Sequence, residues 1–343
     1  MDFTVELLKW YERHGRTLPW RETRDPYPIW LSEVILQQTR IQQGMAYWER
    51  FMQRFPTVDA LAAASEDEVL RLWQGLGYYS RARHLHAAAR QIVERGGFPA
   101  TLEGIRSLKG VGDYTAAAVA SFAFGLPAAA VDGNAYRVMA RYFGIETPIN
   151  STEGKKVFAA LAAQLLPRDR AADYNQAVMD FGATWCTPQS SRCADCPLAE
   201  ACVAWREGRV GLLPVKERKV KMQTRHITYI YVRCHGMTAL RRRGPGDIWQ
   251  GLWEPVCYET GAGEQAAREL SALLQSTAPP RLIKKDVKHV LTHRILMADF
   301  YLWEPDSRPA LPAGYVWIAE ENLDSYAVPR LVERVIFEVR GER

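Results

Sequence analysis

The chain has 343 residues, of which 48% are hydrophobic and 24% are charged, as in ordinary globular proteins of two domains. Its net charge of +5 permits a polyanionic partner without requiring one. No apolar run reaches the roughly 18 residues of a membrane-spanning helix, and no signal-peptide pattern opens the chain, so we expect a cytoplasmic protein without a membrane partner.

The first part of the chain, residues 1–209, has the pattern of helices. Apolar residues recur at helical spacing in Ala-rich stretches, and Gly and Pro separate these stretches. The clearest examples are residues 85–93, 115–124 and 157–166. We therefore predict an all-α domain over residues 1–209.

A glutamate, Glu33, lies in an unusually apolar run near the N-terminus. We predict that a helix begins after Pro28 and carries Glu33 in its second turn. Three of its helical neighbours are apolar: Ile29, Trp30 and Leu36. Removal from water raises the pKa of a carboxyl group, and a carboxyl that keeps its proton near neutral pH suits a general acid. The alternative is an exposed glutamate on an amphipathic face.

The segment 108–115, LKGVGDYT, has the pattern of a turn between two helices. Gly110 and Gly112 allow backbone conformations and a close approach that a Cβ atom would block. A Gly-x-Gly turn that opens a helix presents free N–H groups, which suit a phosphate. An ordinary turn between helices would have the same pattern, so this segment alone does not distinguish a phosphate-binding turn from an ordinary one.

An aspartate, Asp132, follows this turn after one predicted helix that ends at Gly125. The simplest interpretation is an N-cap for a helix over residues 134–142. A helix N-terminus also favours an ionised carboxyl group, so a cap and a catalytic anion are compatible. A hairpin, a helix and then an Asp resemble the helix-hairpin-helix Gly/Pro-Asp arrangement of base-excision glycosylases, which implies a catalytic Asp132.

Four of the six cysteines form a cluster with the spacing C-x6-C-x2-C-x5-C: Cys186, Cys193, Cys196 and Cys202. Four thiolates can surround one zinc ion or one cubane cluster, and the number of ligands does not separate the two. The spacing resembles the [4Fe–4S] loop of the endonuclease III superfamily, which implies an iron–sulfur cluster in loop 186–202. Its role would be structural, with Arg192 as a candidate DNA-phosphate contact. Cys234 and Cys257 stand apart in strand-like sequence, where buried apolar roles are expected.

From residue 226 the pattern changes to alternating aromatic and β-branched residues, which indicates an α+β domain over 226–343. The predicted strands and helices are strands 226–232, 282–289, 295–303 and 315–318, and helices 264–274 and 329–338. Between the domains, residues 210–225 are rich in basic residues and read as a linker. Its charge could lie along a DNA backbone or simply face solvent.

Together these motifs resemble the MutY-type adenine DNA glycosylases, strongly over residues 1–209 and weakly after 226. The matching stretches are WLSEVILQQT at 30–39, QGLGYYSR at 74–81, the 108–115 hairpin, VDGN at 131–134 and the cysteine spacing. The resemblance implies a helical glycosylase domain followed by a Nudix-like domain. The expected partner is double-stranded DNA with an A:8-oxoguanine or A:G mispair, bound by a nucleoid-associated monomer.

The resemblance also implies roles for individual residues. Glu33 would protonate adenine at N7, Asp132 would stabilise or transiently bond the oxocarbenium-like sugar at C1′, and Tyr114 would support both. Bifunctional relatives place a Schiff-base lysine at the position of Tyr114, so we expect little or no lyase activity. The adenine pocket would consist of Trp20, Arg21, Leu36 and Gln176. The residues expected to wedge into the duplex are Gln38 and Tyr78.

The C-terminal domain departs from the family pattern in two places. The paired glutamates of the Nudix catalytic helix are not recognisable around 264–274, which leaves a role in reading the lesion. The family's Phe-Ser-His turn, which meets 8-oxoguanine, corresponds here to Leu291, Thr292 and His293. Thr292 keeps a hydroxyl group but Leu291 lacks the ring, and a plain hairpin turn is the alternative.

Two other functions are open at this point. One is a related glycosylase that acts on another lesion or mispair, such as a thymine mispair. The other is a non-catalytic DNA-binding protein with a metal-stabilised loop, and the presence of both Glu33 and Asp132 argues against it.

Overall fold

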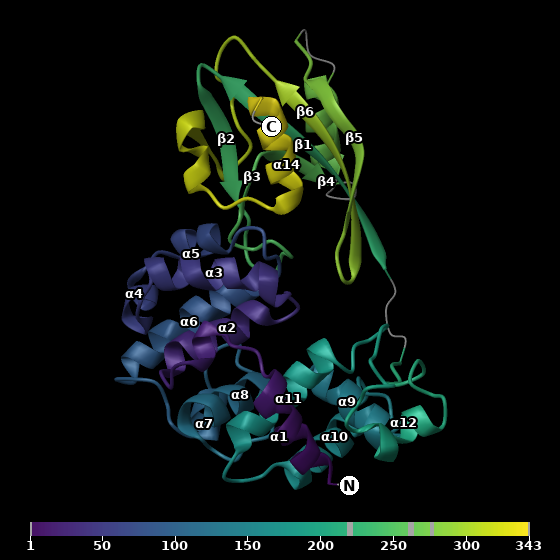
Figure 1. Cartoon of the computed structure of the whole chain (residues 1–343). Coiled ribbons are helices and arrows are strands. Elements are labelled where there is room, and N and C mark those ends of the chain that lie inside the picture. The colour runs from purple at the N-terminus through teal and green to yellow at the C-terminus, as the bar shows by residue number, and fades with distance from the viewer. Residues whose placement is uncertain (1, 218–221, 260–263, 275–277, 342–343) are drawn as a thin grey trace. The chain divides into compact units, whose positions relative to one another are not determined.

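Figure 1 shows the computed structural model of the chain, which describes residues 2–217, 222–259, 264–274 and 278–341. The chain divides into two compact units. The first comprises Met1–Ala63 and His84–Arg218, and the second comprises Ala64–Arg83 and Lys219–Arg343. Among the described residues, no helix combines the length and the apolar character that crossing a membrane requires.

The first unit is helical throughout its described residues, as predicted. Its α-helices are α1 (Phe3–His14), α2 (Pro26–Leu36), α3 (Ile41–Arg54), α4 (Val58–Ala63), α6 (Ser80–Glu94, whose first residues belong to the second unit), α7 (Leu102–Arg106), α8 (Asp113–Phe124), α9 (Gly133–Phe143), α10 (Thr152–Leu165), α11 (Ala171–Thr184) and α12 (Val203–Arg206). Two short 3-10 helices, η1 (Pro19–Arg21) and η2 (Ala199–Ala201), complete it.

The N-terminal helix α1 packs against α11, and α11 packs against α9 (Figure 1). Their shared core contains Phe3, Leu7 and Trp10 of α1 together with Phe158 of α10. Burial of such large apolar side chains contributes roughly 1.5–3 kcal/mol each. This core therefore holds α1, α9 and α11 against one another.

Helix α2 is buried on almost all sides and packs against α3 and α8. It begins at Pro26, before the start that the sequence predicted after Pro28. The prediction was wrong because proline is tolerated in the first turn of a helix, where its missing N–H has no partner anyway. Asp25 caps the helix, and its side chain accepts a hydrogen bond from the backbone N–H of Tyr27 at 2.9 Å.

The second unit is built on a seven-stranded mixed sheet, which agrees with the predicted α+β fold. Strand β1 pairs in parallel with β6 and antiparallel with β2 and β4, and the path of the sheet is β3-β2-β1-β6-β5. The strands are β1 (Gln223–Cys234), β2 (Met237–Arg242), β3 (Trp253–Glu254), β4 (Val256–Glu259), β5 (Arg281–Val290), β6 (Arg294–Trp303) and β7 (Tyr315–Ala319). Its helices are α5 (Glu66–Trp73), α13 (Glu264–Leu274), the 3-10 helix η3 (Glu320–Ser325) and α14 (Arg330–Arg340).

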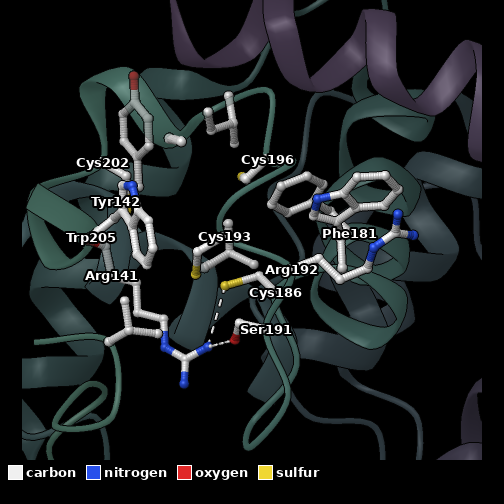
Figure 2. Close-up of a pocket in the computed structure, with 15 residues that line it drawn as sticks. Arg141, Tyr142, Phe181, Cys186, Ser191, Arg192, Cys193, Cys196, Cys202 and Trp205 are labelled. Atoms are coloured by element: carbon white, nitrogen blue, oxygen red, sulfur yellow. Dashed lines mark hydrogen bonds between the residues drawn. The ribbon is translucent and has the colours of Figure 1, made fainter. Parts of the chain in front are cut away.

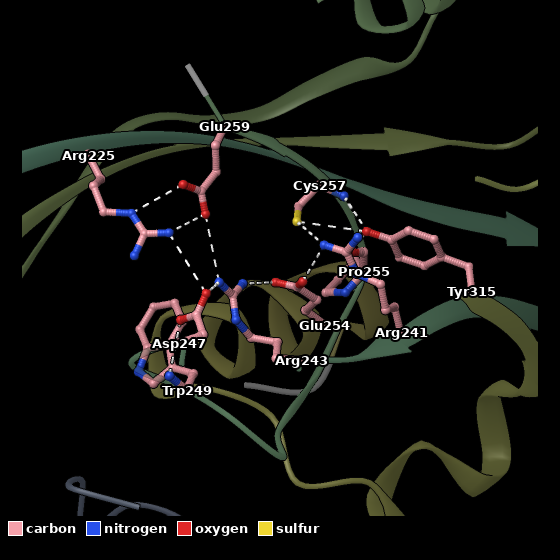
Figure 3. Close-up of polar contacts among 10 residues, drawn as sticks. All are labelled: Arg225, Arg241, Arg243, Asp247, Trp249, Glu254, Pro255, Cys257, Glu259 and Tyr315. Atoms are coloured by element: carbon pink, nitrogen blue, oxygen red, sulfur yellow. Dashed lines mark hydrogen bonds and ion pairs between the residues drawn. The ribbon is translucent and has the colours of Figure 1, made fainter. Parts of the chain in front are cut away.

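A buried network of ion pairs joins strands β1 to β4 of this unit (Figure 3). Glu254 is fully buried and accepts hydrogen bonds from Arg241 (2.8 Å) and Arg243. Arg243 also contacts Asp247, and at the start of β1 Arg225 pairs with Glu259 (Nε to Oε2, 3.1 Å). A buried carboxylate persists only with such partners, so the network fixes the loop that precedes β3.

The stretch predicted as a linker, 210–225, is folded at both ends. Leu213 is buried in the helical unit, and the carbonyl of Val215 accepts a hydrogen bond from the N–H of Ile149. At the other end, β1 already begins at Gln223, so Arg225 lies in the sheet. Residues 218–221 of the predicted linker lie outside the described residues. The prediction of a linker rested on the basic residues of this stretch and overlooked its apolar residues, such as Leu213, which pack in the helical unit.

Candidate active site

A cleft of about 890 Å³ opens in the helical unit. Its walls come from η1, α2, α8 and the segment that leads into α9. The predicted site residues that line it are Trp20, Arg21, Glu33, Leu36, Gln38, Tyr114 and Asp132. Both predicted catalytic carboxyl groups thus face the same cleft. Gln176 is not among the lining residues, and its Oε1 accepts a hydrogen bond from the Tyr11 hydroxyl at 2.5 Å.

Glu33 is buried in α2, with 8% of its surface exposed. Burial raises the pKa of its carboxyl group, and the charge of the nearby Asp132 acts in the same direction, so that the pKa of Glu33 among all its neighbours is about 7. A hydrogen bond from Tyr114 and the charge of Arg21 act in the opposite direction. Near neutral pH, Glu33 therefore holds a proton for a substantial part of the time.

The hydroxyl group of Tyr114, on α8, donates a hydrogen bond of 2.6 Å to Oε2 of Glu33. Burial raises the pKa of this phenol well above its ordinary value, and the charges of Glu33 and Asp132 add to the effect. The phenol thus remains protonated and serves as a donor. Met179 of α11 lies on the other side, with its sulfur 3.8 Å from the same hydroxyl oxygen.

Asp132 is the N-cap of α9, as the simpler interpretation of the sequence predicted. Its Oδ1 accepts from the backbone N–H of Ala135 at 2.7 Å, and its Oδ2 accepts from the side-chain amide of Asn134 at 2.7 Å. Burial raises the pKa of Asp132, while these hydrogen bonds and the charge of Arg137 lower it. The cap and a place in the cleft coexist in one residue, because the start of α9 faces the cleft.

A second buried carboxylate, Asp180 of α11, adjoins the cleft and was missed by the sequence reasoning. Its side chain has no exposed surface and pairs with Arg21 at 2.8 Å. Arg16 contributes its backbone N–H and its guanidinium to the same carboxylate. An acidic residue inside the apolar run AVMDFGA was the available signal, of the same kind that singled out Glu33.

Trp20, predicted for the adenine pocket, is buried in η1 and makes an edge-to-face contact with Trp48, with ring centroids 5.4 Å apart. Such aromatic pairs contribute about 0.5–1.5 kcal/mol beyond the area they bury. Leu36 ends α2 and is half-buried at the cleft wall. These side chains give the cleft an apolar wall that suits a flat aromatic ring.

The two glycines of the hairpin differ in whether a residue with a Cβ atom could replace them. Gly110 has φ +76°, and a Cβ atom built there would lie 2.5 Å from Cβ of His84, so only glycine fits. Gly112 caps α8 with φ −93°, and no protein atom lies within 4 Å of a built Cβ. The prediction of a conformational need for glycine is therefore wrong for Gly112, and its approach to a phosphate stays a prediction.

The two predicted wedge residues share an unusual backbone. Gln38 in the first unit has φ +58°, and Tyr78 in the second unit has φ +48°. Residues other than glycine rarely adopt this left-handed conformation, and strain of this kind is concentrated at functional positions. Both side chains are exposed. Within the second unit, the hydroxyl groups of Tyr78 and Thr292 lie 2.7 Å apart.

The segment Leu291, Thr292 and His293 forms the turn between β5 and β6. The N–H of Leu291 donates to the carbonyl of Arg294 at 2.8 Å and closes the turn. Thr292 and His293 are exposed at its tip. The turn is thus a hairpin with polar side chains exposed at its tip, and one of them, Thr292, is hydrogen-bonded to Tyr78.

The four clustered cysteines line one pocket together with Arg141 and Ser191 (Figure 2). Arg141 is buried, and its Nη1 lies 3.4 Å from Sγ of Cys186 and 2.7 Å from Oγ of Ser191. All four thiols are free of disulfide bonds. Among the residues that the structure describes, no group of three or more His, Cys, Asp or Glu side chains lies close enough together to hold a metal ion.

The donor set nevertheless fits a thiolate-bound metal centre. Burial and the neighbouring cysteines together raise the pKa of Cys196 to about 12. Four adjacent thiolates therefore need a cation among them, and iron or zinc supplies that charge. Arg192, the predicted phosphate contact, stacks over the Trp185 ring at 3.9 Å and lies 3.8 Å from Asp195.

Hydrogen bonds connect the cleft with the cysteine loop through Arg137. Its Nε donates to the carbonyl of Cys186 at 2.8 Å, and its Nη2 donates to Oδ1 of Asn134 at 2.7 Å. Asn134 in turn donates to Asp132. Sequence reasoning gave Arg137 and Asn134 no role, because only the fold brings the two segments together.

Two family comparisons match separate parts of the chain. Residues 31–164 match the HhH-GPD superfamily of base excision DNA repair proteins, and residues 228–338 match the NUDIX domain. Among solved structures, that of a thermostable thymine-DNA glycosylase is 32% identical, with a TM-score of 0.56, and covers 60% of this chain and 95% of that chain. The structure of an endonuclease III–DNA covalent intermediate is 22% identical with a TM-score of 0.53 and indicates a shared fold.

Adenine DNA glycosylases of several organisms are similar to this chain, two of them over nearly its whole length. The adenine DNA glycosylase of Mus musculus is 43% identical over 395 residues, which cover 97% of this chain and 77% of the mouse protein. That of Buchnera aphidicola subsp. Baizongia pistaciae is 33% identical and covers 98% of this chain and 97% of its own length. The match with the adenine DNA glycosylase of Homo sapiens, 45% identical over 213 residues, spans 59% of this chain and 39% of the human protein.

Proposed function

We propose that this chain, which belongs to the adenine DNA glycosylase family of base excision repair enzymes, acts on mispaired adenine in duplex DNA. It would hydrolyse the N-glycosidic bond of adenine paired with 8-oxoguanine or guanine. The observation that carries the proposal is the pair of carboxyl groups in one cleft. Glu33 has a pKa of about 7, and Asp132 faces the same space. An acid for the leaving group and an anion for the sugar are what glycoside hydrolysis requires.

The adenosine must first leave the base stack, which costs a few kcal/mol. Glu33 then donates its proton to N7 of adenine, and the bond between N9 and C1′ breaks with its electron pair on the base. The carboxylate of Asp132 stabilises the positive charge that develops on the sugar. Water adds to C1′, and the proton it loses returns to Glu33. A positioned general acid is worth about 10²–10⁴ in rate.

Tyr114 acts on Glu33 in this scheme. Its hydroxyl donates to Oε2 of Glu33, so it stabilises the carboxylate that remains after the proton has moved. A phenol has no amine with which to form a Schiff base at C1′. We therefore assign the chain a monofunctional reaction that leaves an abasic site uncut.

The adenine ring would lie against the apolar wall that Trp20 and Leu36 provide. Arg21 lines the cleft beside them and stays cationic, because its pairing with Asp180 raises its pKa. Gln176 of α11 accepts a hydrogen bond from the hydroxyl of Tyr11 on α1 and does not line the cleft, so its contact with adenine stays a prediction. A flat apolar wall beside the fixed cation of Arg21 suits a purine.

Contacts with the duplex would come from several exposed positions. Gln38 and Tyr78 supply the wedges, with backbones already in the left-handed conformation. The hairpin glycines offer backbone N–H groups to a phosphate. The remaining assigned DNA contacts are Arg192 and the turn of Leu291, Thr292 and His293. Phosphate contacts position the enzyme, and the polar turn would read the oxidised base.

We assign a [4Fe–4S] cluster to Cys186, Cys193, Cys196 and Cys202. When bound, the cluster would supply the positive charge that four thiolates need and would hold the loop between the first two cysteines in place. Arg141 donates to Cys186, Ser191 and the carbonyl of Thr187, so it supports the same loop from behind. This role is structural.

The test is a glycosylase assay on duplexes that carry A:8-oxoguanine, A:G, A:C and T:G pairs, followed by hot alkali. Adenine release opposite 8-oxoguanine and guanine is expected. Replacing Thr292 with Ala should lower the preference for 8-oxoguanine over guanine, whereas Thr224→Ala, on β1, should not. Release of thymine instead of adenine would favour a thymine-mispair enzyme, and no cleavage at all would favour a non-catalytic DNA-binding protein.

A further inference from the structure

We propose that Asp180 is a positioning residue for proton transfer: it fixes Arg16 and Arg21 at the cleft wall and offsets the cationic charge that Arg21 presents to Glu33. This inference rests on the proposed role of Glu33 as the general acid. It concerns a buried residue of α11 that does not itself line the cleft.

The geometry ties three segments to one carboxylate. Oδ1 of Asp180 accepts from Arg16 Nε at 2.9 Å and from Arg21 Nη2 at 2.8 Å. Oδ2 accepts from the backbone N–H of Arg16 and from Arg21 Nη1, both at 2.8 Å. Arg21 also donates to the carbonyl of Arg16 at 3.0 Å. Because Trp20 precedes Arg21 in η1, the same contacts hold the aromatic wall of the cleft against α11.

Asp180 is an anion whenever the enzyme works. Burial alone would raise the pKa of this carboxyl group, but hydrogen bonds from Arg21 and Arg16 hold it below its ordinary value. Paired charge-assisted hydrogen bonds of this kind are among the strongest in proteins. A buried guanidinium without such a partner would be costly, so the two residues depend on each other.

The charged and titratable groups that face Glu33 come from three other elements. They are Tyr114 of α8, Asp132 at the start of α9 and Arg21 of η1. Helix α11 contributes the apolar sulfur of Met179 near the Tyr114 hydroxyl. Arg21 is the one cation among these groups and favours the ionised form of Glu33. Asp180 offsets that cation and so helps Glu33 to keep its proton.

The experiment is the pH dependence of single-turnover adenine release. A general acid works only while protonated, so the rate falls as the pH rises through the pKa of Glu33. In Asp180→Asn the charge of Arg21 is no longer offset, so the fall should move to lower pH by about one unit. Above both pKa values the rate should drop about tenfold, and below pH 6 it should approach the wild-type rate.

For the variant Arg21→Gln we expect the pH at which the rate falls to shift in the opposite direction. It leaves the Asp180 anion without its principal partner near Glu33, so the fall in rate should move to higher pH, whatever happens to adenine affinity. This second variant keeps the proposal testable should Asp180→Asn fail to fold, which circular dichroism will show. The matched control is Asp173→Asn, an acidic residue on the same helix that pairs with Arg170 outside the cleft. Its pH profile should be that of the wild type.

Equal loss of rate at all pH values in Asp180→Asn, or shifts of the same sign in both variants, would overturn the inference and leave Asp180 a structural residue. Failure of the proposed function looks different. In that case Glu33→Gln would retain the wild-type rate, and the wild-type profile would show no fall that depends on Glu33.

Discussion

The Tyr114 hydroxyl donates a 2.6 Å hydrogen bond to Oε2 of Glu33, and this contact links a side chain of α8 to one of α2 in the lining of the cleft. Two opposing influences meet there. Burial raises the pKa of Glu33, the hydrogen bond stabilises the ionised form and lowers it, and the net pKa is about 7. The balance leaves an acid that can both give and regain a proton near neutral pH.

This balance predicts the pH profile of the enzyme. Single-turnover adenine release should fall as the pH rises through about 7, where Glu33 loses its proton. Tyr114→Phe removes a donor to the carboxylate, so the pKa of Glu33 should rise and the fall should move to higher pH. The maximal rate should drop about tenfold, because the glutamate formed on proton transfer loses its partner. A profile unchanged by Tyr114→Phe contradicts the contact's role.

Absence of a suitable amine predicts the outcome of borohydride trapping. Incubation with an A:8-oxoguanine duplex and sodium borohydride should give no covalent protein–DNA product, because Tyr114 forms no Schiff base. The strand should break only after hot alkali. A trapped adduct on denaturing gels would mean that a lysine elsewhere reaches C1′, and the monofunctional assignment would be wrong.

The hairpin glycines form a matched pair. Gly110→Ala should lower the free energy of unfolding by about 2 kcal/mol or more, because φ is +76° and the new methyl group meets His84. Gly112→Ala should leave that free energy nearly unchanged, since the backbone and the space both accept a methyl group. Urea unfolding measures both. If Gly112 approaches a phosphate, its variant should still bind duplex DNA more weakly, and wild-type affinity would remove it from the DNA contacts.

The cysteine pocket predicts a coloured protein. Protein purified without oxygen should absorb visible light and contain about four iron and four sulfide ions per chain. Cys196→Ser should lose most of this absorption, whereas Cys257→Ser in the second unit should retain it. A colourless preparation with one zinc ion per chain would refute the cluster.

Much of the site could be predicted from sequence because its signals are local. The apolar neighbours of Glu33 lie within one helical turn, and Gly125 ends α8 in the left-handed conformation, as such glycines do. Asp180 could not be placed, because its partner Arg16 lies 164 positions earlier in the chain. The sequence also could not predict that Ala64–Arg83 packs with the second unit, because helical periodicity does not show which core a helix joins.

The variant Asp132→Asn shows whether Glu33 and Asp132 act on one extruded deoxyadenosine. Asparagine caps a helix as well as aspartate, so α9 and the fold should be preserved. Single-turnover adenine release from an A:8-oxoguanine duplex should fall by about 10³-fold or more, while the dissociation constant for that duplex changes only a few-fold. Adenine release near the wild-type rate would mean that the carboxylate of Asp132 does not stabilise the sugar.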